Sequence, residues 1–130
     1  MNAIQAGGAI ETVVLATDPV RVLRFGATTH NAHRIHYDAV HAASDGLERP
    51  VVMAQLQGTL FHRAAARAAG QGGTVTALSW QNRAPAYVGE TLTVSGRVID
   101  VQDGVAHLEL EEHTEDGRLC ATGSAVVRLP

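Results

Sequence analysis

The chain has 130 residues, of which 45% are apolar and 18% are charged, and its formal net charge is −3. This length suits one domain with one hydrophobic core. The weakly acidic balance offers neither the basic field that binds nucleic acid nor a polybasic patch for a membrane surface. All ten basic residues are arginines, which excludes Schiff-base chemistry on lysine and a phosphate-binding P-loop lysine.

The first quarter of the chain predicts a leader, a strand and a short helix. Residues 1–10 contain small residues and glycines and lack the positive start of a signal peptide, so we expect a loose leader. Glu11–Ala16 predicts a strand, and Asp18 before a proline is typical of a helix start. The helix predicted over Pro19–Thr28 carries apolar residues on one face: Val20, Leu23 and Ala27.

The strongest helical pattern lies in the middle of the chain. A second short helix is expected around Ala39–Ala43 and a short apolar strand at Val51–Met53. Ala54–Ala69 then predicts a long helix, which Gly70 ends because glycine readily takes the left-handed conformation. Its apolar face consists of Leu56, Leu60, Phe61, Ala64, Ala65 and Ala68.

The rest of the chain predicts an antiparallel meander. The expected strands are Thr74–Asn82, Thr91–Val101, Ala106–His113 and Leu119–Leu129. Asp-Gly pairs at 103–104 and 116–117 are strong hairpin signals. One long helix followed by a meander indicates an α+β domain spanning residues 1–130, in which the helix packs on a curved antiparallel sheet. This is the outline of a hot-dog fold, although other α+β folds share the pattern.

The segment THNAHRIHYD places three histidines at intervals of three: His30, His33 and His36. A zinc site needs three or four converging ligands, and the segment does not read as a helix that would gather them on one face. A solvated polar loop is a second interpretation. The third is an acid–base site. His36 lies between Ile35 and Tyr37, so we expect it to leave solvent and act as a base toward water, which Asn31 would orient.

The same residues resemble a family. Residues 25–38 with residues 51–56 are similar to the MaoC-like hydratases and dehydratases, whose signature is Asp-x-Asn-Pro-x-His. Asn31 and His36 occupy the aspartate and histidine positions, while His33 and Arg34 replace Asn-Pro. The segment NAHRIHYD resembles most the branch of hydroxyacyl-thioester dehydratases and mesaconyl-CoA (3-methylfumaryl-CoA) hydratases, and the similarity extends to YVGETLTVSGRV at 87–98.

The resemblance implies a hot-dog enzyme that adds water to, or removes it from, an enoyl-CoA, either branched or dicarboxylic. His36 and Asn31 would be catalytic, and the backbone N–H of Ala54 would stabilise the enolate oxygen. The family's Val-His-Gly-Pro-Leu becomes VMAQL at residues 52–56, so Met53 replaces a histidine and Ala54 a glycine. Contacts with the substrate are expected from Arg34, Tyr37, Met53 and Gln55.

The resemblance also implies a homodimer or dimer of dimers that binds an acyl-CoA thioester, with no metal and no cofactor beyond the CoA of the substrate. Two other functions stay open: a hot-dog acyl-CoA thioesterase and a non-catalytic acyl-CoA-binding partner subunit. Cys120 is the single cysteine and cannot form an internal disulfide, so we expect a structural thiol and a cytoplasmic location. No run of about 18 apolar residues is present to span a membrane.

Overall fold

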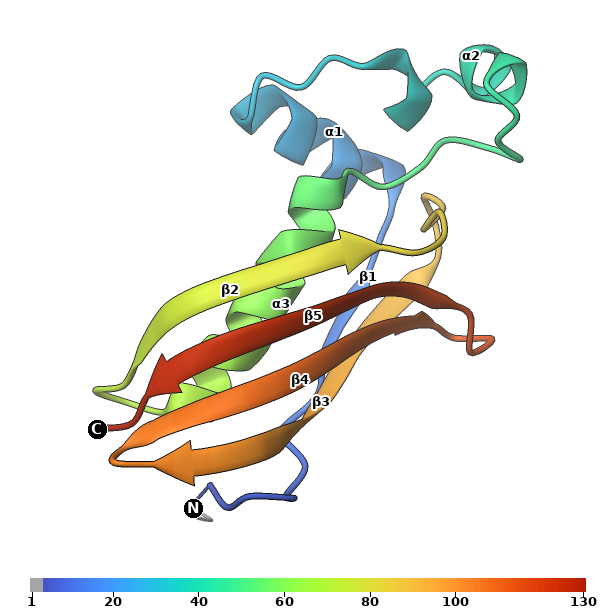
Figure 1. Cartoon of the computed structure of the whole chain (residues 1–130). Helices are drawn as coiled ribbons and strands as arrows, with labels where there is room; N and C mark the ends of the chain where they lie inside the picture. Colours follow the sequence, from blue (N-terminus) through green and yellow to red (C-terminus); the bar gives the residue numbers. More distant parts are fainter. Residues whose placement is uncertain (1–3) are drawn as a thin grey trace.

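The computed structural model describes residues 4–130 and contains one antiparallel sheet of five strands in the order β1-β3-β4-β5-β2. Figure 1 shows the sheet curling around one long helix. The strands are β1 Val13–Ala16, β2 Thr74–Asn82, β3 Thr91–Gln102, β4 Val105–Thr114 and β5 Leu119–Arg128. The predicted α+β hot-dog architecture is therefore confirmed, with β1 and β2 at the two edges of the sheet.

The helices fall into two groups. The long helix α3, Ala54–Ala69, lies in the concave face of the sheet, while α1, α2 and a short 3₁₀ helix η1 lie beyond its N-terminal end (Figure 1). These smaller helices are α1 Pro19–Thr28, η1 Arg34–His36 and α2 Ala39–Ser44. Asp18 begins α1 because its carboxylate accepts a hydrogen bond from the N–H of Arg21 at 2.8 Å.

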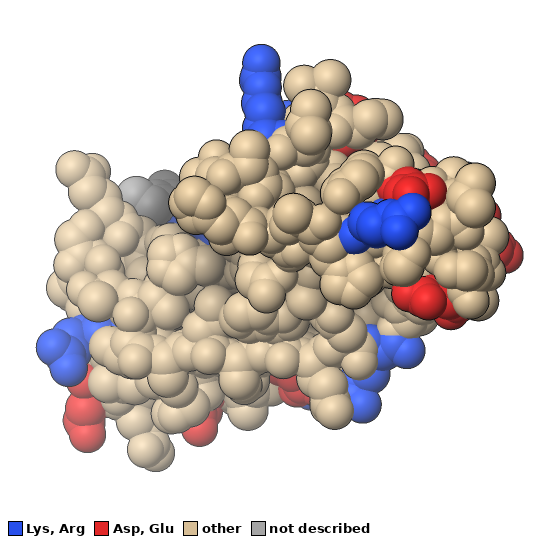
Figure 2. Space-filling model, turned by 90° about the horizontal axis from the view of Figure 1, so that it is seen from above, with Lys and Arg blue, Asp and Glu red and all other residues tan. Residues whose placement is uncertain are grey.

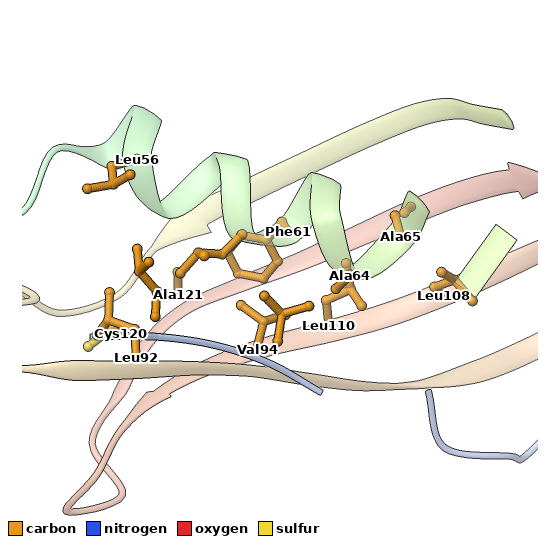
Figure 3. Packing of buried hydrophobic residues seen from close by; sticks show 14 of the residues in the cluster. Leu56, Phe61, Ala64, Ala65, Leu92, Val94, Leu108, Leu110, Cys120 and Ala121 are labelled. Carbon is orange, nitrogen blue, oxygen red and sulfur yellow. The ribbon is translucent and has the colours of Figure 1, made fainter. Parts of the chain in front are cut away.

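The core lies between α3 and the sheet. Phe61, Leu60 and Ala64 of α3 have no exposed surface, and neither do Leu92 and Leu110 of the strands that face them. Figure 3 shows the ring of Phe61 directed from the helix toward the sheet. The four-residue period of the helix and the alternation along the strands therefore bury one continuous apolar layer.

Both predicted hairpin turns form. Asp103 and Gly104 have φ of 52° and 75°, the left-handed pair that a two-residue hairpin turn requires. Gly117 has φ of 88° at the second turn, between β4 and β5. These turns fix the register of three neighbouring strands.

Two expectations at the start of the chain and one near its middle need correction. The first strand begins at Val13 and not at Glu11. The leader is ordered over its second half, because the N–H of Gly7 donates to Val98 O at 2.7 Å and that of Ile10 to Gly96 O at 3.0 Å. Residues 1–3 lie outside the described residues. The stretch expected as a strand near 51–53 is extended, but only Val51 forms a bridge to another segment.

The apolar face predicted for α1 does not enter the core. Val22 and Gly26 are its buried residues, whereas Val20 and Leu23 are 57% and 67% exposed. The helix caps the end of α3 and therefore buries only the narrow side that faces it. No helix among residues 4–130 is long and apolar enough to cross a membrane.

Candidate functional site

The histidine-rich segment is a compact turn that follows α1. His30 takes a left-handed φ of 57°, which reverses the chain and lets the N–H of Asn31 donate to Gly26 O at 2.8 Å. The single 3₁₀ turn η1 then carries His36 inward. The segment is therefore held by its own backbone hydrogen bonds, with Asn31 and His36 on the same side.

His36 is buried, with 9% of its surface exposed. Its Nδ1 lies 2.7 Å from the backbone oxygen of Val51. A carbonyl oxygen only accepts hydrogen bonds, so Nδ1 must carry a proton and donate it. In the neutral ring, Nε2 is then left with a free lone pair. This is the arrangement that a general base requires.

Asn31 faces that lone pair. Its Oδ1 accepts the N–H of His33 at 3.2 Å, which leaves its Nδ2 directed at Nε2 of His36, 3.5 Å away. The sequence predicts that Asn31 orients a water molecule. In the structure the oxygen is engaged within the turn, and only the N–H₂ group is directed at the histidine.

A cavity of about 450 Å³ opens beside these two residues. Asn31, His36 and Tyr37 contribute its only polar side chains among the described residues, and no aspartate, glutamate, lysine or arginine lines it. Five lining residues belong to α1: Pro19, Val22, Leu23, Gly26 and Ala27. A polar pair in an otherwise apolar hollow is a common form of a small-molecule site.

The start of α3 lies three residues beyond the carbonyl that anchors His36. Met53 is its N-cap residue and provides no side-chain cap, and the first backbone bond of the helix runs from Gln57 N–H to Met53 O at 3.2 Å. The N–H of Ala54 therefore has no acceptor within the helix, and the helix dipole adds positive potential there. Ala54 itself does not line the cavity beside Asn31 and His36.

Of the other residues expected near the substrate, Tyr37 lines the cavity and Arg34 does not. Tyr37 donates its hydroxyl to Ala32 O at 3.0 Å. The guanidinium of Arg34 binds the carboxylate of Asp38 at 2.8 Å on the exposed surface, and Asp38 also begins α2 by accepting from His41 N–H.

Met53 and Gln55 do not line the cavity either. Met53 is 2% exposed, and its terminal methyl group packs closely against Gly26 of α1. Gln55 is exposed on the first turn of α3. Met53 thus fills the junction between two helices within the chain, because an extended N-cap residue places its side chain under the helix that follows.

Two features were missed from the sequence, one at the site and one in the core. The first is the Val51 carbonyl, a backbone atom that no residue pattern reveals. The second is a buried pair beneath α3, in which Gln57 Nε2 donates to Glu112 Oε1 at 2.7 Å. A glutamate on the apolar face of a strand was a signal for it, since carboxylates are rarely buried without a partner.

Two other kinds of chemistry, metal binding and nucleophilic attack by a thiol, were considered for the described residues. Among residues 4–130 no three histidine, cysteine or acidic residues are grouped so that they could hold a metal ion. Cys120 is fully buried, and burial raises the pKa of its thiol to about 11. It is therefore a structural thiol, as expected, because the reactive form of cysteine is the thiolate.

Comparisons with known proteins identify the family of the chain. Residues 4–88 match the family described as hydroxyacyl-thioester dehydratase type 2. The (R)-specific enoyl-CoA hydratase of Aeromonas caviae is 30% identical over 112 residues, which are 84% of each chain. The solved (R)-hydratase from A. caviae involved in PHA biosynthesis superposes with a TM-score of 0.89 and 26% identity over 100% of both chains.

More distant structures share the fold. The unliganded R-hydratase PhaJ1 from Pseudomonas aeruginosa has a TM-score of 0.88 at 19% identity, covering 98% of this chain and 83% of that one. The ChsH1–ChsH2 complex of Mycobacterium tuberculosis has a TM-score of 0.86 at 21% identity, covering 96% and 98%. With its family match, its curated relative and its MaoC-like hot-dog structure, the chain belongs to the hydroxyacyl-thioester dehydratase type 2 family of hydro-lyases.

Proposed function

We propose that this chain hydrates the α,β double bond of an enoyl-CoA and, in reverse, dehydrates the 3-hydroxyacyl-CoA. One observation carries the proposal: His36 is fixed by the Val51 carbonyl so that its free Nε2 lone pair faces the amide of Asn31 at the edge of an apolar cavity. A base held in this way, beside a donor and out of bulk water, suits activation of one water molecule.

In the proposed step, Asn31 Nδ2 donates to the water oxygen while the water donates a proton toward His36 Nε2. The water oxygen forms a bond to the β-carbon as its O–H bond breaks, and the proton passes to Nε2. The π electrons of the double bond move through the α-carbon onto the thioester oxygen. The imidazolium then returns the proton to the α-carbon, which regenerates the base and balances the reaction.

The enolate oxygen needs a donor, and we assign that role to the backbone N–H of Ala54. It is the first N–H of α3 and has no acceptor within the helix. A preorganised N–H at a helix N-terminus is worth most where charge develops in the transition state. The methyl group of Ala54 does not remove this donor.

The remaining expectations belong to the same proposal. The CoA moiety is part of the substrate, and the absence of a metal or other cofactor stays a prediction. A branched acyl chain also stays a prediction, and so does the dicarboxylic alternative, as in mesaconyl-CoA, against which the lining of the cavity is weighed below. We infer a homodimer or dimer of dimers, because β2 leaves a nine-residue strand at the edge of the sheet. A cytoplasmic location is inferred from the single unpaired thiol.

The proposal is tested with crotonyl-CoA and two readouts in one reaction. Hydration removes the enoyl absorbance without releasing free CoA, whereas thioester hydrolysis releases a thiol. Loss of enoyl absorbance at a constant thiol concentration is the expected result. Thiol release without hydration would identify a thioesterase instead.

A second candidate is a non-catalytic acyl-CoA-binding partner subunit. The observation that favours it is Asn31, whose side chain carries no acid or base and whose oxygen is engaged with His33 N–H. Such a protein would bind enoyl-CoA esters, yet it would leave both the enoyl absorbance and the thiol concentration unchanged.

A further inference from the structure

The cavity beside Asn31 and His36 continues along α1 as a purely apolar hollow. Leu23 and Ala27 of α1 line it together with Pro50 and Val88. Leu23 is 67% exposed although it is a large aliphatic side chain. Figure 2 looks onto this end of the molecule and shows mostly uncharged residues there.

We propose that this hollow binds the acyl chain of the substrate, that it accepts only an uncharged aliphatic chain, and that Ala27 limits the chain's length. This inference rests on the proposed hydration at His36. The β-carbon must lie against Nε2 of His36, so the substituent that continues from it has to leave along the rest of the cavity. Leu23, Ala27 and Val88 are among the apolar residues that line it.

The lining disfavours a second carboxylate on the acyl chain. Burying an ionised carboxylate without a partner is costly, and a basic side chain would be needed to offset it. The described lining contains no arginine, and the chain has no lysine. Arg34 is the basic residue within the histidine segment, but it is bound to Asp38 and lies outside the cavity. Dicarboxylic esters are therefore expected to bind poorly.

Because the hollow is small, the size of the side chain at residue 27 should determine how long an acyl chain fits. A volume of about 450 Å³ is near the lower end of the range of roughly 300–1,000 Å³ for small-molecule pockets. Ala27 is exposed on the last part of α1 and lines the cavity. Replacing its methyl group with a benzyl group would fill part of the hollow without disturbing the core.

Saturated acyl-CoA esters test this inference without any turnover. The affinities of butyryl-CoA, octanoyl-CoA and succinyl-CoA are measured by calorimetry for the parent, for Ala27→Phe and for Val40→Phe. Val40 is 81% exposed on α2 and does not line the cavity, so its variant controls for an added surface phenyl ring. Circular dichroism confirms that each variant is folded.

The parent should bind octanoyl-CoA at least about tenfold more tightly than butyryl-CoA, since each buried methylene is worth roughly fourfold. That ratio should fall to within about twofold in Ala27→Phe and stay unchanged in Val40→Phe. Succinyl-CoA should bind at least about tenfold more weakly than butyryl-CoA, because of its buried carboxylate.

Equal affinities for butyryl-CoA and octanoyl-CoA in the parent would overturn the inference. So would an unchanged ratio in Ala27→Phe, or succinyl-CoA binding as tight as that of butyryl-CoA. Because saturated esters cannot be hydrated, these results do not depend on catalysis. A failure of the proposed hydration appears only in the crotonyl-CoA assay, and the two failures are thereby distinguished.

Discussion

Gln57 of α3 donates a 2.7 Å hydrogen bond to Glu112 of β4, and both side chains are almost fully buried. The second carboxyl oxygen of Glu112 has no hydrogen-bond partner among residues 4–130. Burial raises the pKa of this carboxyl from 4.5 to about 7, although the bond from Gln57 acts in the opposite direction. The core therefore holds a glutamate that stays protonated well above its ordinary range.

This pair predicts a pH dependence of stability. Between pH 4.5 and 7 the unfolded chain releases the Glu112 proton while the folded chain retains it. The contribution to the free energy of unfolding is therefore complete below pH 4.5 and is lost as the pH rises to 7. Its size is about 3 kcal/mol, since each pH unit in this window corresponds to about 1.4 kcal/mol.

Glu112→Gln should abolish this contribution, because its amide does not titrate and has nearly the same shape. Urea unfolding of the parent and the variant at pH 5 and pH 7.5 measures the difference, and subtraction removes the effect of groups that both proteins share. An identical loss of stability in both proteins between these pH values would show that Glu112 is not the group responsible.

The contact between Gly58 and Trp80 predicts that Gly58→Ala lowers stability when Trp80 is present and raises it when Trp80 is replaced by alanine. A Cβ at Gly58 of α3 would lie 2.4 Å from the indole ring of Trp80 on β2. Gly58→Ala should therefore destabilise the parent by up to about 2 kcal/mol, because overpacking exceeds the gain in helix propensity. In a Trp80→Ala background the same change should stabilise the protein by up to about 1 kcal/mol. Urea unfolding of the four proteins measures both effects, and equal effects in the two backgrounds would refute the contact.

Regular periodicity explains which parts of the fold could be predicted. The bounds of Ala54–Ala69, Pro19–Thr28 and Thr74–Asn82 agree with the structure to the residue, because capping residues and side-chain periods act locally. The ordering of residues 7–10 was not predictable in this way. It depends on backbone hydrogen bonds to β3, which leave no pattern of side chains in the sequence.

The sequence identified candidate residues of the site, but it could not predict how their side chains are oriented. The spacing of Asn31 and His36 identified a pair that the structure places 3.5 Å apart. The spacing could not reveal that Val51 O fixes the ring of His36. Resemblance gave Met53 a position near the substrate, whereas packing against Gly26 turns its side chain into the protein.

The edge strand β2 predicts assembly in solution. Its nine residues pair with β5 on one side only, which leaves the other row of backbone groups without a strand in the described chain. Long open edges are normally covered, so sedimentation at micromolar concentration should show a dimer or a larger species. A clean monomer would contradict the inferred homodimer or dimer of dimers.

His36 and its neighbour His33 provide a matched pair for the proposed base. His36→Ala should lower turnover of crotonyl-CoA by about 10²–10⁴-fold, the range for removing a positioned proton-transfer group. His33→Ala should have a much smaller effect, because the exposed His33 ring packs edge-on to His36 and accepts the N–H of Ile35 but does not line the cavity. Acyl-CoA affinity should change little in either variant. Equal losses in the two variants would assign the effect to the turn and not to a base.

Two substitutions of Asn31 distinguish a group that orients the water from a group that acts as a second base. In Asn31→Asp one carboxylate oxygen can still accept the His33 N–H, while the other takes the place of Nδ2 opposite His36 Nε2. Two acceptors then face each other and can share the proton of the attacking water, so turnover should equal or exceed that of the parent. Asn31→Leu keeps a similar volume but offers no donor, and misplacement of the water should cost up to about 10²-fold. Steady-state hydration rates for both variants decide the point. If Asn31→Leu turns over as fast as the parent, Asn31 does not orient the water, and His36 would have to act without it.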